Sequence, residues 1–256
     1  MTISLFGAVL PIDAGFVAVV LAVTAAGLAR GFAGFGAALI MIPVASAVYG
    51  PTVAIPVLSI IDSVLALPFL IDAVRRCVWP EVAPILIAAM LGVPIGVAFL
   101  ATTDPEIIRW VLCLFILAFV AVLAQGWRYE GRPPLSARFG IGTAAGLASG
   151  FTGIGGPPII LFWLGGQGDA ATVRANVFVF FGLLSASSLI SFGAADLLTG
   201  EVMTLSLVMS PIYALALWFG ARAFRGGDER LFRRIALSIC TLAAIIGLPA
   251  LDAWLG

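Results

Sequence analysis

The sequence predicts an all-α integral membrane protein, folded as an inverted-repeat helical bundle. Of its 256 residues, 62% are hydrophobic and 10% are charged, whereas soluble domains carry about 25% charged residues. The apolar runs are continuous, which argues against a β-barrel, whose strands alternate polar and apolar residues. Two glycine-rich clusters interrupt these runs, one beginning at Gly31 and the other 119 positions later at Gly150. Such a pair of breaks at matching places is typical of secondary transporters.

Six apolar runs reach the length of about 20 residues that a helix needs to cross a bilayer. They cover residues 52–73, 80–101, 106–126, 171–195, 201–221 and 231–251. Two further segments, 14–49 and 139–167, each contain one glycine cluster, and we expect each to form a helical hairpin that turns at its cluster. Only 12 residues separate Arg138 from Gly150, or about 18 Å of helix. The second hairpin is therefore expected to re-enter the membrane, whereas the first either crosses it or re-enters.

The arginines predict which loops face the cytoplasm. All thirteen basic residues are Arg, and ten of them lie in the three polar breaks at 72–80, 125–138 and 222–234. The positive-inside rule makes these breaks cytoplasmic. The breaks at 102–105 and 198–201 contain no Arg, so they are expected to face outward. Both termini are predicted to be periplasmic.

The chain also predicts two copies of one unit in opposite orientation. Three glycines of the first cluster align with three of the second at a constant offset of 119, and a charged helix start at 104–109 aligns with one at 228–233. The loop after the first full span carries Arg75 and Arg76, but its counterpart carries Asp196 and Glu201 and no Arg. The repeats are placed at 14–126 and 139–251, within a single membrane domain, 1–256.

The glycine clusters are the predicted binding site. Each ends where a new helix is expected, at Gly36–Ala37 and at Gly156-Pro157. A helix N-terminus offers unpaired N–H groups and a partial positive charge, and glycine allows a ligand to approach the backbone. Close helix packing is the alternative interpretation of each cluster. The residues predicted to bind a small anion are Arg30, Gly31, Phe32, Gly34, Gly36, Gly150, Thr152, Gly153, Gly155, Gly156, Pro157, Arg174 and Asn176.

One carboxylate lies at membrane depth. Asp62 is near the middle of the run 52–73, where burial of a charge costs a few kcal/mol and therefore indicates function. It is the candidate for proton coupling, with a structural pairing to an Arg or cation binding as alternatives. For Arg174, near a predicted cytoplasmic loop, snorkelling to the lipid headgroups is the alternative to binding. Serine hydroxyls at positions 59, 63, 185, 187 and 188 are also expected on the lining.

Several other classes of function are disfavoured. The chain has no His, no HExxH motif and no phosphate-binding GxxxxGK[ST] motif, and Asp62 lacks the second carboxylate that aspartyl chemistry needs. Its three cysteines, Cys77, Cys113 and Cys240, are far apart in sequence and signal neither a metal site nor a disulfide. We therefore expect no enzyme, cofactor or metal, and no nucleic acid as partner. The expected partners are the lipid bilayer and a small anionic substrate, and a homodimer is left open.

The two glycine clusters and the tripeptide Arg174-Ala175-Asn176 resemble those of the TauE/SafE family, the sulfite exporter or toluene-sulfonate uptake permeases. Residues 78–81 and the helix starts at 104–109 and 228–233 fit the same pattern, so that the resemblance covers about residues 14–251. It implies a permease of the bacterial inner membrane that moves sulfite, sulfoacetate or other organosulfonates. This chain departs from many relatives in the prolines after Gly156 and in having Asp62, which leaves the particular substrate open.

The predicted function is therefore secondary-active transport of small sulfur-containing anions. Export is the expected direction, driven by the proton gradient or by the membrane potential. The two halves are expected to rock and so expose the site alternately to each side. An anion channel, or a permease for an organic anion without sulfur, is the alternative.

Overall fold

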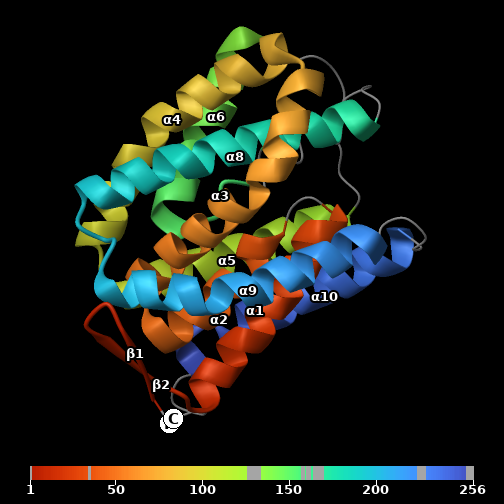
Figure 1. Ribbon diagram of the computed structural model, residues 1–256. Coiled ribbons are helices and arrows are strands. Elements are labelled where there is room, and N and C mark those ends of the chain that lie inside the picture. Colours follow the sequence, from red (N-terminus) through yellow and green to blue (C-terminus); the bar gives the residue numbers. More distant parts are fainter. Residues whose placement is uncertain are drawn as a thin grey trace.

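The structure is a computed structural model that describes residues 2–33, 36–125, 134–156, 159, 163, 170–223 and 229–251. Long helices make up most of it (Figure 1). They are α1 (Ala14–Ala33), α2 (Ala37–Tyr49), α3 (Pro51–Arg76), α4 (Trp79–Thr102), α5 (Pro105–Ala124), α6 (Leu135–Thr152), α8 (Ala170–Ala194), α9 (Gly200–Ala223) and α10 (Glu229–Ile246), followed by a 3₁₀ turn, η1 (Pro249–Leu251).

The helices occupy the predicted apolar runs. Within the described residues, α1, α4, α5, α8 and α9 are long and apolar enough to cross a membrane, and α3 makes a sixth if its two bent parts count as one span. The two parts of α3 meet at 73° between Leu65 and Leu70. Pro68 lies in this interval, and proline bends helices because it has no N–H to donate. Proline at the start of α3, α4 or α5 is harmless, since the first N–H groups of a helix have no partner.

The last predicted span is shorter than expected. Helix α10 ends at Ile246, whereas the sequence predicted helix to residue 251. The buried Arg109 guanidinium donates to the Gly247 carbonyl oxygen from Nε (3.3 Å) and Nη2 (3.1 Å). This capping satisfies a carbonyl that the helix would otherwise have used, and Pro249 cannot continue the helix.

The all-α prediction missed a small β-hairpin at the N-terminus. Strands β1 (Thr2–Leu5) and β2 (Ala8–Pro11) pair antiparallel, with Leu5 opposite Ala8. The Thr204 hydroxyl donates to the Leu5 carbonyl oxygen (2.7 Å) and Leu10 is buried, so the hairpin packs on the first turns of α9. Alternation over only four residues in each strand is too short to distinguish a strand from helix by pattern alone.

Figure 1 shows two groups of helices, one above the other. The upper group contains α4, α6 and α8, and the lower group contains α1, α2, α5, α9 and α10; helices contact one another within each group. Helix α3 joins the two groups, because it contacts α2 and α9 of the lower group and α8 of the upper group. Because of its bend, α3 can pack against helices of both groups.

The two most extensive helix–helix contacts depend on glycine. A Cβ on Gly146 of α6 would collide with the Ala89 backbone of α4, and one on Gly150 with the Val93 carbonyl. In the same way, a Cβ on Gly27 of α1 would meet the backbone of α9, as would one on Gly31. The helices pack at backbone distance, in the small-xxx-small manner of membrane helices.

These two contacts correspond position by position. Gly27 and Gly31 contact α9 around residues 213 and 217, and Gly146 and Gly150 contact α4 around residues 89 and 93. The glycines are related by the offset of 119, and the residues that they meet are related by 124. Those are the offsets read from the glycine clusters and from the charged helix starts. In both contacts, a helix from residues 14–126 packs on a helix from residues 139–251.

Hydrogen bonds and close charges identify the two ends of the molecule. The β1–β2 hairpin, the start of α9 and the end of α2 lie at one end, where Tyr49 is within electrostatic range of Asp13 and Glu201. The starts of α4, α6 and α8 lie at the opposite end, where Arg138 Nη1 donates to the Pro80 carbonyl and Val78 N–H donates to Asn176. Both ends of the segment 14–49 therefore lie at the hairpin end. Most of the second arm of the segment 139–167 lies outside the described residues.

Candidate functional site

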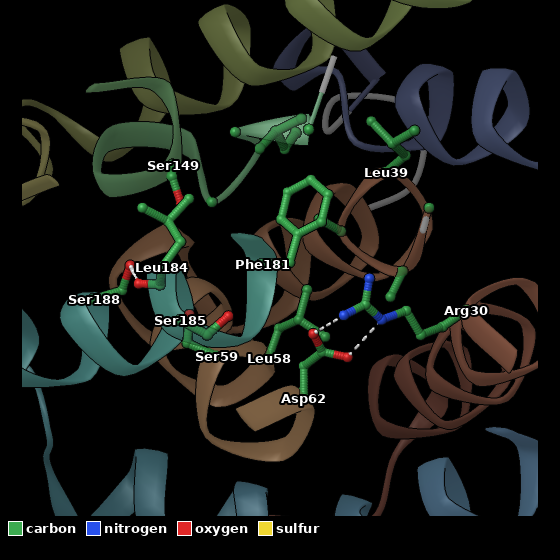
Figure 2. Close-up of a pocket in the computed structure, with 17 residues that line it drawn as sticks. Arg30, Leu39, Leu58, Ser59, Asp62, Ser149, Phe181, Leu184, Ser185 and Ser188 are labelled. Carbon is green, nitrogen blue, oxygen red and sulfur yellow. Dashed lines mark hydrogen bonds and ion pairs between the residues drawn. The ribbon is translucent and has the colours of Figure 1, made fainter. Parts of the chain in front are cut away.

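A cavity of about 80 Å³ lies between the upper and lower helix groups. One buried water needs about 10–15 Å³, so the cavity has room for a small anion. Figure 2 shows that its walls come from distant parts of the chain. The lining residues are Arg30, Gly36, Ala37, Ala38, Leu39, Leu58, Ser59, Asp62, Ser149, Gly153, Ile154, Gly155, Gly156, Phe181, Leu184, Ser185 and Ser188.

A buried ion pair forms the charged wall. Arg30 of α1 donates to both carboxylate oxygens of Asp62 in α3, from Nε to Oδ1 (3.0 Å) and from Nη2 to Oδ2 (2.9 Å). Their side chains are only 5% and 14% exposed. The fully buried Tyr213 of α9 donates its hydroxyl to Asp62 Oδ1 (2.8 Å). Three helices thus stabilise one carboxylate, because a buried charge needs a partner and hydrogen bonds together.

Two aromatic rings of α8 pack against the same guanidinium. The Arg30 Cζ lies 5.4 Å from the centroid of the Phe178 ring and 5.7 Å from that of Phe181. Both distances fall within the range of a cation–π interaction. In Figure 2 the Phe181 ring lies between the Arg30–Asp62 pair and the serines of the opposite wall. These rings keep water away from Arg30, which strengthens its attraction for an anion.

The opposite wall is neutral and polar. Ser149 of α6 and Ser185 of α8 line it, and neither hydroxyl makes a hydrogen bond within the described part of the chain. The hydroxyls of Ser59 and Ser188 donate to the carbonyls of Ile55 and Leu184, four residues earlier. Such back-bonding leaves the oxygen lone pairs available, whereas the two serines without a partner have a donor for a ligand oxygen.

Backbone from both glycine clusters completes the wall. Gly36, with φ +99°, immediately precedes the first residue of α2, and Gly153, with φ +71°, immediately follows α6. Other residues rarely adopt a positive φ. The first N–H groups of α2 have no partner in their own helix, and Ala37 and Ala38 line the cavity. The N-terminus of α2 therefore lies at the wall of the cavity.

The site lies far from both ends of the molecule. Asp62 follows the start of α3 by 11 residues and Tyr213 follows the start of α9 by 13, or about 17 and 20 Å of helix. Both helices start at the hairpin end. A bilayer core is about 30 Å thick, so these helix lengths correspond to more than half of that thickness.

The structure divides the predicted site residues into two sets. Arg30, Gly36, Gly153, Gly155 and Gly156 line the cavity, as does Asp62. The other described residues that are predicted to bind the anion do not line it. Of the serines expected on the lining, Ser59, Ser185 and Ser188 line the cavity, and Ser63 and Ser187 do not.

The residues of the second set have structural contacts. Gly31 and Gly150 lie in the two glycine contacts between helices, which agrees with the packing alternative. The Thr152 hydroxyl donates to the Ala148 carbonyl (2.8 Å) and accepts from Ile154 N–H (3.3 Å), which stabilises the turn after α6. Asn176 is buried and accepts from Val78 N–H (2.9 Å), which joins the starts of α8 and α4. Phe32 is also buried.

Three predicted residues cannot be placed in this division. Gly34 and Pro157 lie outside the described residues, and of Arg174 only the backbone, in the first turns of α8, is described.

Sequence reasoning missed Tyr213, Ser149 and Phe181. A signal for Tyr213 existed, because a tyrosine in the middle of the run 201–221 lies far from the interfaces where tyrosines usually anchor membrane helices. The repeat also contained a signal for the other two. Ser149 and Phe181 occupy the positions that correspond, at the offset of 119, to Arg30 and Asp62. Both members of each corresponding pair line the same cavity.

The arrangement is suited to holding an anion by charge and hydrogen bonds. A guanidinium presents several donors to sulfonate, carboxylate or phosphate oxygens, and the serines add neutral donors. Among the described residues, no group of three or more His, Cys, Asp or Glu side chains comes together to hold a metal ion.

The family model described as "Sulfite exporter TauE/SafE" matches residues 19–246, a range that contains every residue lining the cavity. No curated protein and no solved structure matches the chain.

Proposed function

Because the chain belongs to the TauE/SafE family, we propose that it is a secondary-active transporter of small sulfur-containing anions. Sulfite, sulfoacetate and other organosulfonates are the proposed substrates, and export is the proposed direction. The family and the apolar helices make the chain a multi-pass membrane protein. We place it in the bacterial inner membrane, with both termini periplasmic.

The observation that carries this proposal is the cavity that contains Arg30. The guanidinium is nearly inaccessible, is held by Asp62 and lies across the cavity from serine hydroxyls. A buried cation with neutral donors opposite is suited to an anion of a few heavy atoms. Asp62 is the proposed coupling group, because it is the charged partner that a proton neutralises.

An inverted repeat would account for the arrangement of the helices. The corresponding contacts of α1 with α9 and of α6 with α4 support it, as does the position of Arg75, Arg76 and Arg138 toward the end opposite the β-hairpin. In this proposal the segments 14–49 and 139–167 enter from opposite sides. Alternating access then follows from movement of the two helix groups around the cavity between them.

Flux into proteoliposomes tests the function. We expect the purified protein to transport labelled sulfite or sulfoacetate at rates well above those of empty liposomes. The double variant Arg30→Gln with Asp62→Asn should lose at least 90% of this flux, because the cavity keeps its shape but loses its cation. Both residues change together because an unpaired buried charge costs about 3–5 kcal/mol.

Arg222→Gln is the matched control. This arginine is exposed at the end of α9, where it stacks on Trp218 (3.8 Å to the ring centroid), and its loss should leave flux unchanged. Absence of flux for every anion offered would refute transport. Turnover far above about 10³ per second would indicate a channel, since carriers must change conformation in each cycle. Preference for carboxylates over sulfonates would indicate a permease for organic anions without sulfur.

A further inference from the structure

One guanidinium in the cavity already has a resident anion. Asp62 engages both Nε and Nη2 of Arg30 through its two carboxylate oxygens. A substrate anion that approaches Arg30 therefore meets a carboxylate of like charge on the same cation. Among the lining residues, all of them described, Arg30 is the only base and Asp62 the only acid.

From this geometry we propose that the substrate anion and one proton bind together, the anion on Arg30 and the proton on Asp62. Each monovalent anion is then transported with one proton and without net charge. The inference rests on the proposed function and decides between its two driving forces: the pH gradient acts on transport and the membrane potential does not. With an acidic periplasm this gradient favours uptake, so that export in this scheme is driven by the concentration gradient of the anion itself.

Charge balance is the physical reason. The empty site is neutral, because one guanidinium faces one carboxylate. Addition of a monovalent anion alone would leave a net negative charge among the buried aromatic and aliphatic side chains, which is unfavourable in a medium of low dielectric constant. A proton from the solution that the cavity faces neutralises Asp62, so that the sum of charges with the anion bound is again zero. No bond other than the O–H of Asp62 forms or breaks.

Among the described residues around Asp62, no second group can take over this role. Arg30 faces it from α1 and Tyr213 from α9, and both donate to its oxygens. Helix α2 contributes only aliphatic side chains to the lining, and the described side chains of α8 that line it are Phe181, Leu184, Ser185 and Ser188. Helices α4 and α5 also contact α3, but none of their residues line the cavity. Of the charged residues of α5, Glu106 is exposed and Arg109 bonds to Gly247.

Because the cavity lies between the two helix groups, its net charge affects how easily the groups can close around the anion. Arg30, Asp62 and Tyr213 come from α1, α3 and α9, whereas Ser149, Phe181 and Ser185 come from α6 and α8 of the upper group. Closure around the anion brings the neutral wall toward the charged wall. Closure also removes water from the cavity, which is unfavourable when the site carries a net charge. Only the empty site and the site with both anion and proton bound are neutral, so these are the two forms that can change conformation.

Binding to the purified protein provides the first test. The probe is methanesulfonate, which stays monovalent over the whole pH range, so that pH acts on the protein alone. In weakly buffered detergent solution, binding should take up one proton per anion wherever Asp62 is ionised. In that range affinity should fall about tenfold per pH unit, as linkage requires for one proton. Asp62→Asn should bind without proton uptake and with less than a twofold change per pH unit.

Flux into proteoliposomes under imposed gradients provides the second test and needs only the wild-type chain. An acidic exterior should cause at least fivefold accumulation of methanesulfonate. A potassium diffusion potential of either sign, clamped with valinomycin, should change the initial rate by less than 20%. Asp62→Asn should equilibrate the anion without accumulation, and Arg222→Gln should behave as wild type.

The outcomes separate this inference from the proposed function. Flux that follows the membrane potential, or binding without proton uptake by the wild type, overturns the inference and leaves transport intact. Absence of flux and of binding for every anion refutes both. If Asp62→Asn fails to fold, the comparison of the two gradients in the wild type decides the question.

Discussion

Asp62 accepts hydrogen bonds from two side chains, and they have different effects on its charge. Arg30 supplies the positive charge, and Tyr213 supplies a neutral donor to Oδ1 (2.8 Å). A hydrogen bond donated to a carboxylate favours its ionised form. Tyr213 therefore stabilises the carboxylate of Asp62, although it does not line the cavity.

Replacement of Tyr213 by Phe tests this positioning role. Loss of the hydroxyl removes a hydrogen bond to a charged group worth about 1.5–3 kcal/mol. In the proposed coupling the empty site holds the ionised carboxylate and the loaded site does not, so the empty site loses more support and the affinity for methanesulfonate at pH 7 should rise by about tenfold or more. The measurement is the affinity of the wild type and of the variant at that pH. A merely structural role would lower the affinity, and an unchanged affinity would show that the hydroxyl does not act on Asp62.

At the scale of single residues, the sequence identifies the charged residues of the site better than it identifies the residues that they contact. Arg30 and Asp62 were recognised singly, because charged residues in apolar runs are costly. Their pairing was only one of several alternatives, since 32 positions separate them and the packing of three helices decides which side chains meet. Thr152 and Asn176 are predicted from the sequence to bind substrate, but their side chains form hydrogen bonds with backbone groups.

Among the elements, the glycines of each cluster have two different tasks. Gly36 and Gly153 adopt a positive φ at turns beside the cavity, whereas Gly31 and Gly150 allow helices to touch. Sequence alone cannot distinguish these tasks, because both require only the absence of a Cβ. Close packing thus accounts for Gly31 and Gly150, whereas Gly36 and Gly153 lie at turns.

Helix α6 contains a matched pair of glycines that tests the packing. A Cβ at Gly146 would collide with the Ala89 backbone, whereas one at Gly140 would meet nothing within 4 Å. Gly146→Ala should therefore lower stability by about 1–3 kcal/mol, as overpacking does. Gly140→Ala should leave stability unchanged or slightly higher, because alanine favours helix. Thermal unfolding in detergent measures both. Equal melting temperatures would mean that α4 and α6 do not pack at backbone distance.

For the whole molecule, the inverted arrangement predicts on which side of the bilayer each loop lies. The native Cys77 next to Arg76 and a cysteine introduced at the exposed Thr199 lie near opposite ends of the molecule. A membrane-impermeant maleimide should label Cys77 only from the cytoplasm. It should label Thr199→Cys, in a chain with Cys77→Ala, only from the periplasm. Labelling of both from the same side would overturn the inverted repeat.

The pH dependence of this labelling follows from the environment of the thiol. Burial raises the pKa of Cys77, and the nearby Glu81 carboxylate raises it further. Because the thiolate is the reactive form, labelling should be slow at pH 7. The rate should rise by about tenfold per pH unit until the raised pKa is reached. Cys113 and Cys240 are buried in the bundle and should not react in the folded protein.

The positions of the long helices are more predictable from the sequence than the structures near the two ends of the chain. Continuous apolar runs identify helices of membrane length, since few other structures satisfy the backbone in lipid. The β-hairpin and the early end of α10 depend instead on a few contacts with distant residues, such as Thr204 with Leu5 and Arg109 with Gly247. Periodicity contains no information about such partners.

The glycine contacts also determine which helices move together. Helices that touch at their backbones cannot slide or part without opening empty space, so α6 and α4 must travel as one body, and α1 and α9 as another. Each body combines one helix from residues 14–126 with one from residues 139–251. The boundary between the two bodies therefore does not run between residues 126 and 139, where the two predicted repeats meet, and a chain cut there would leave neither fragment with both helices of a glycine contact.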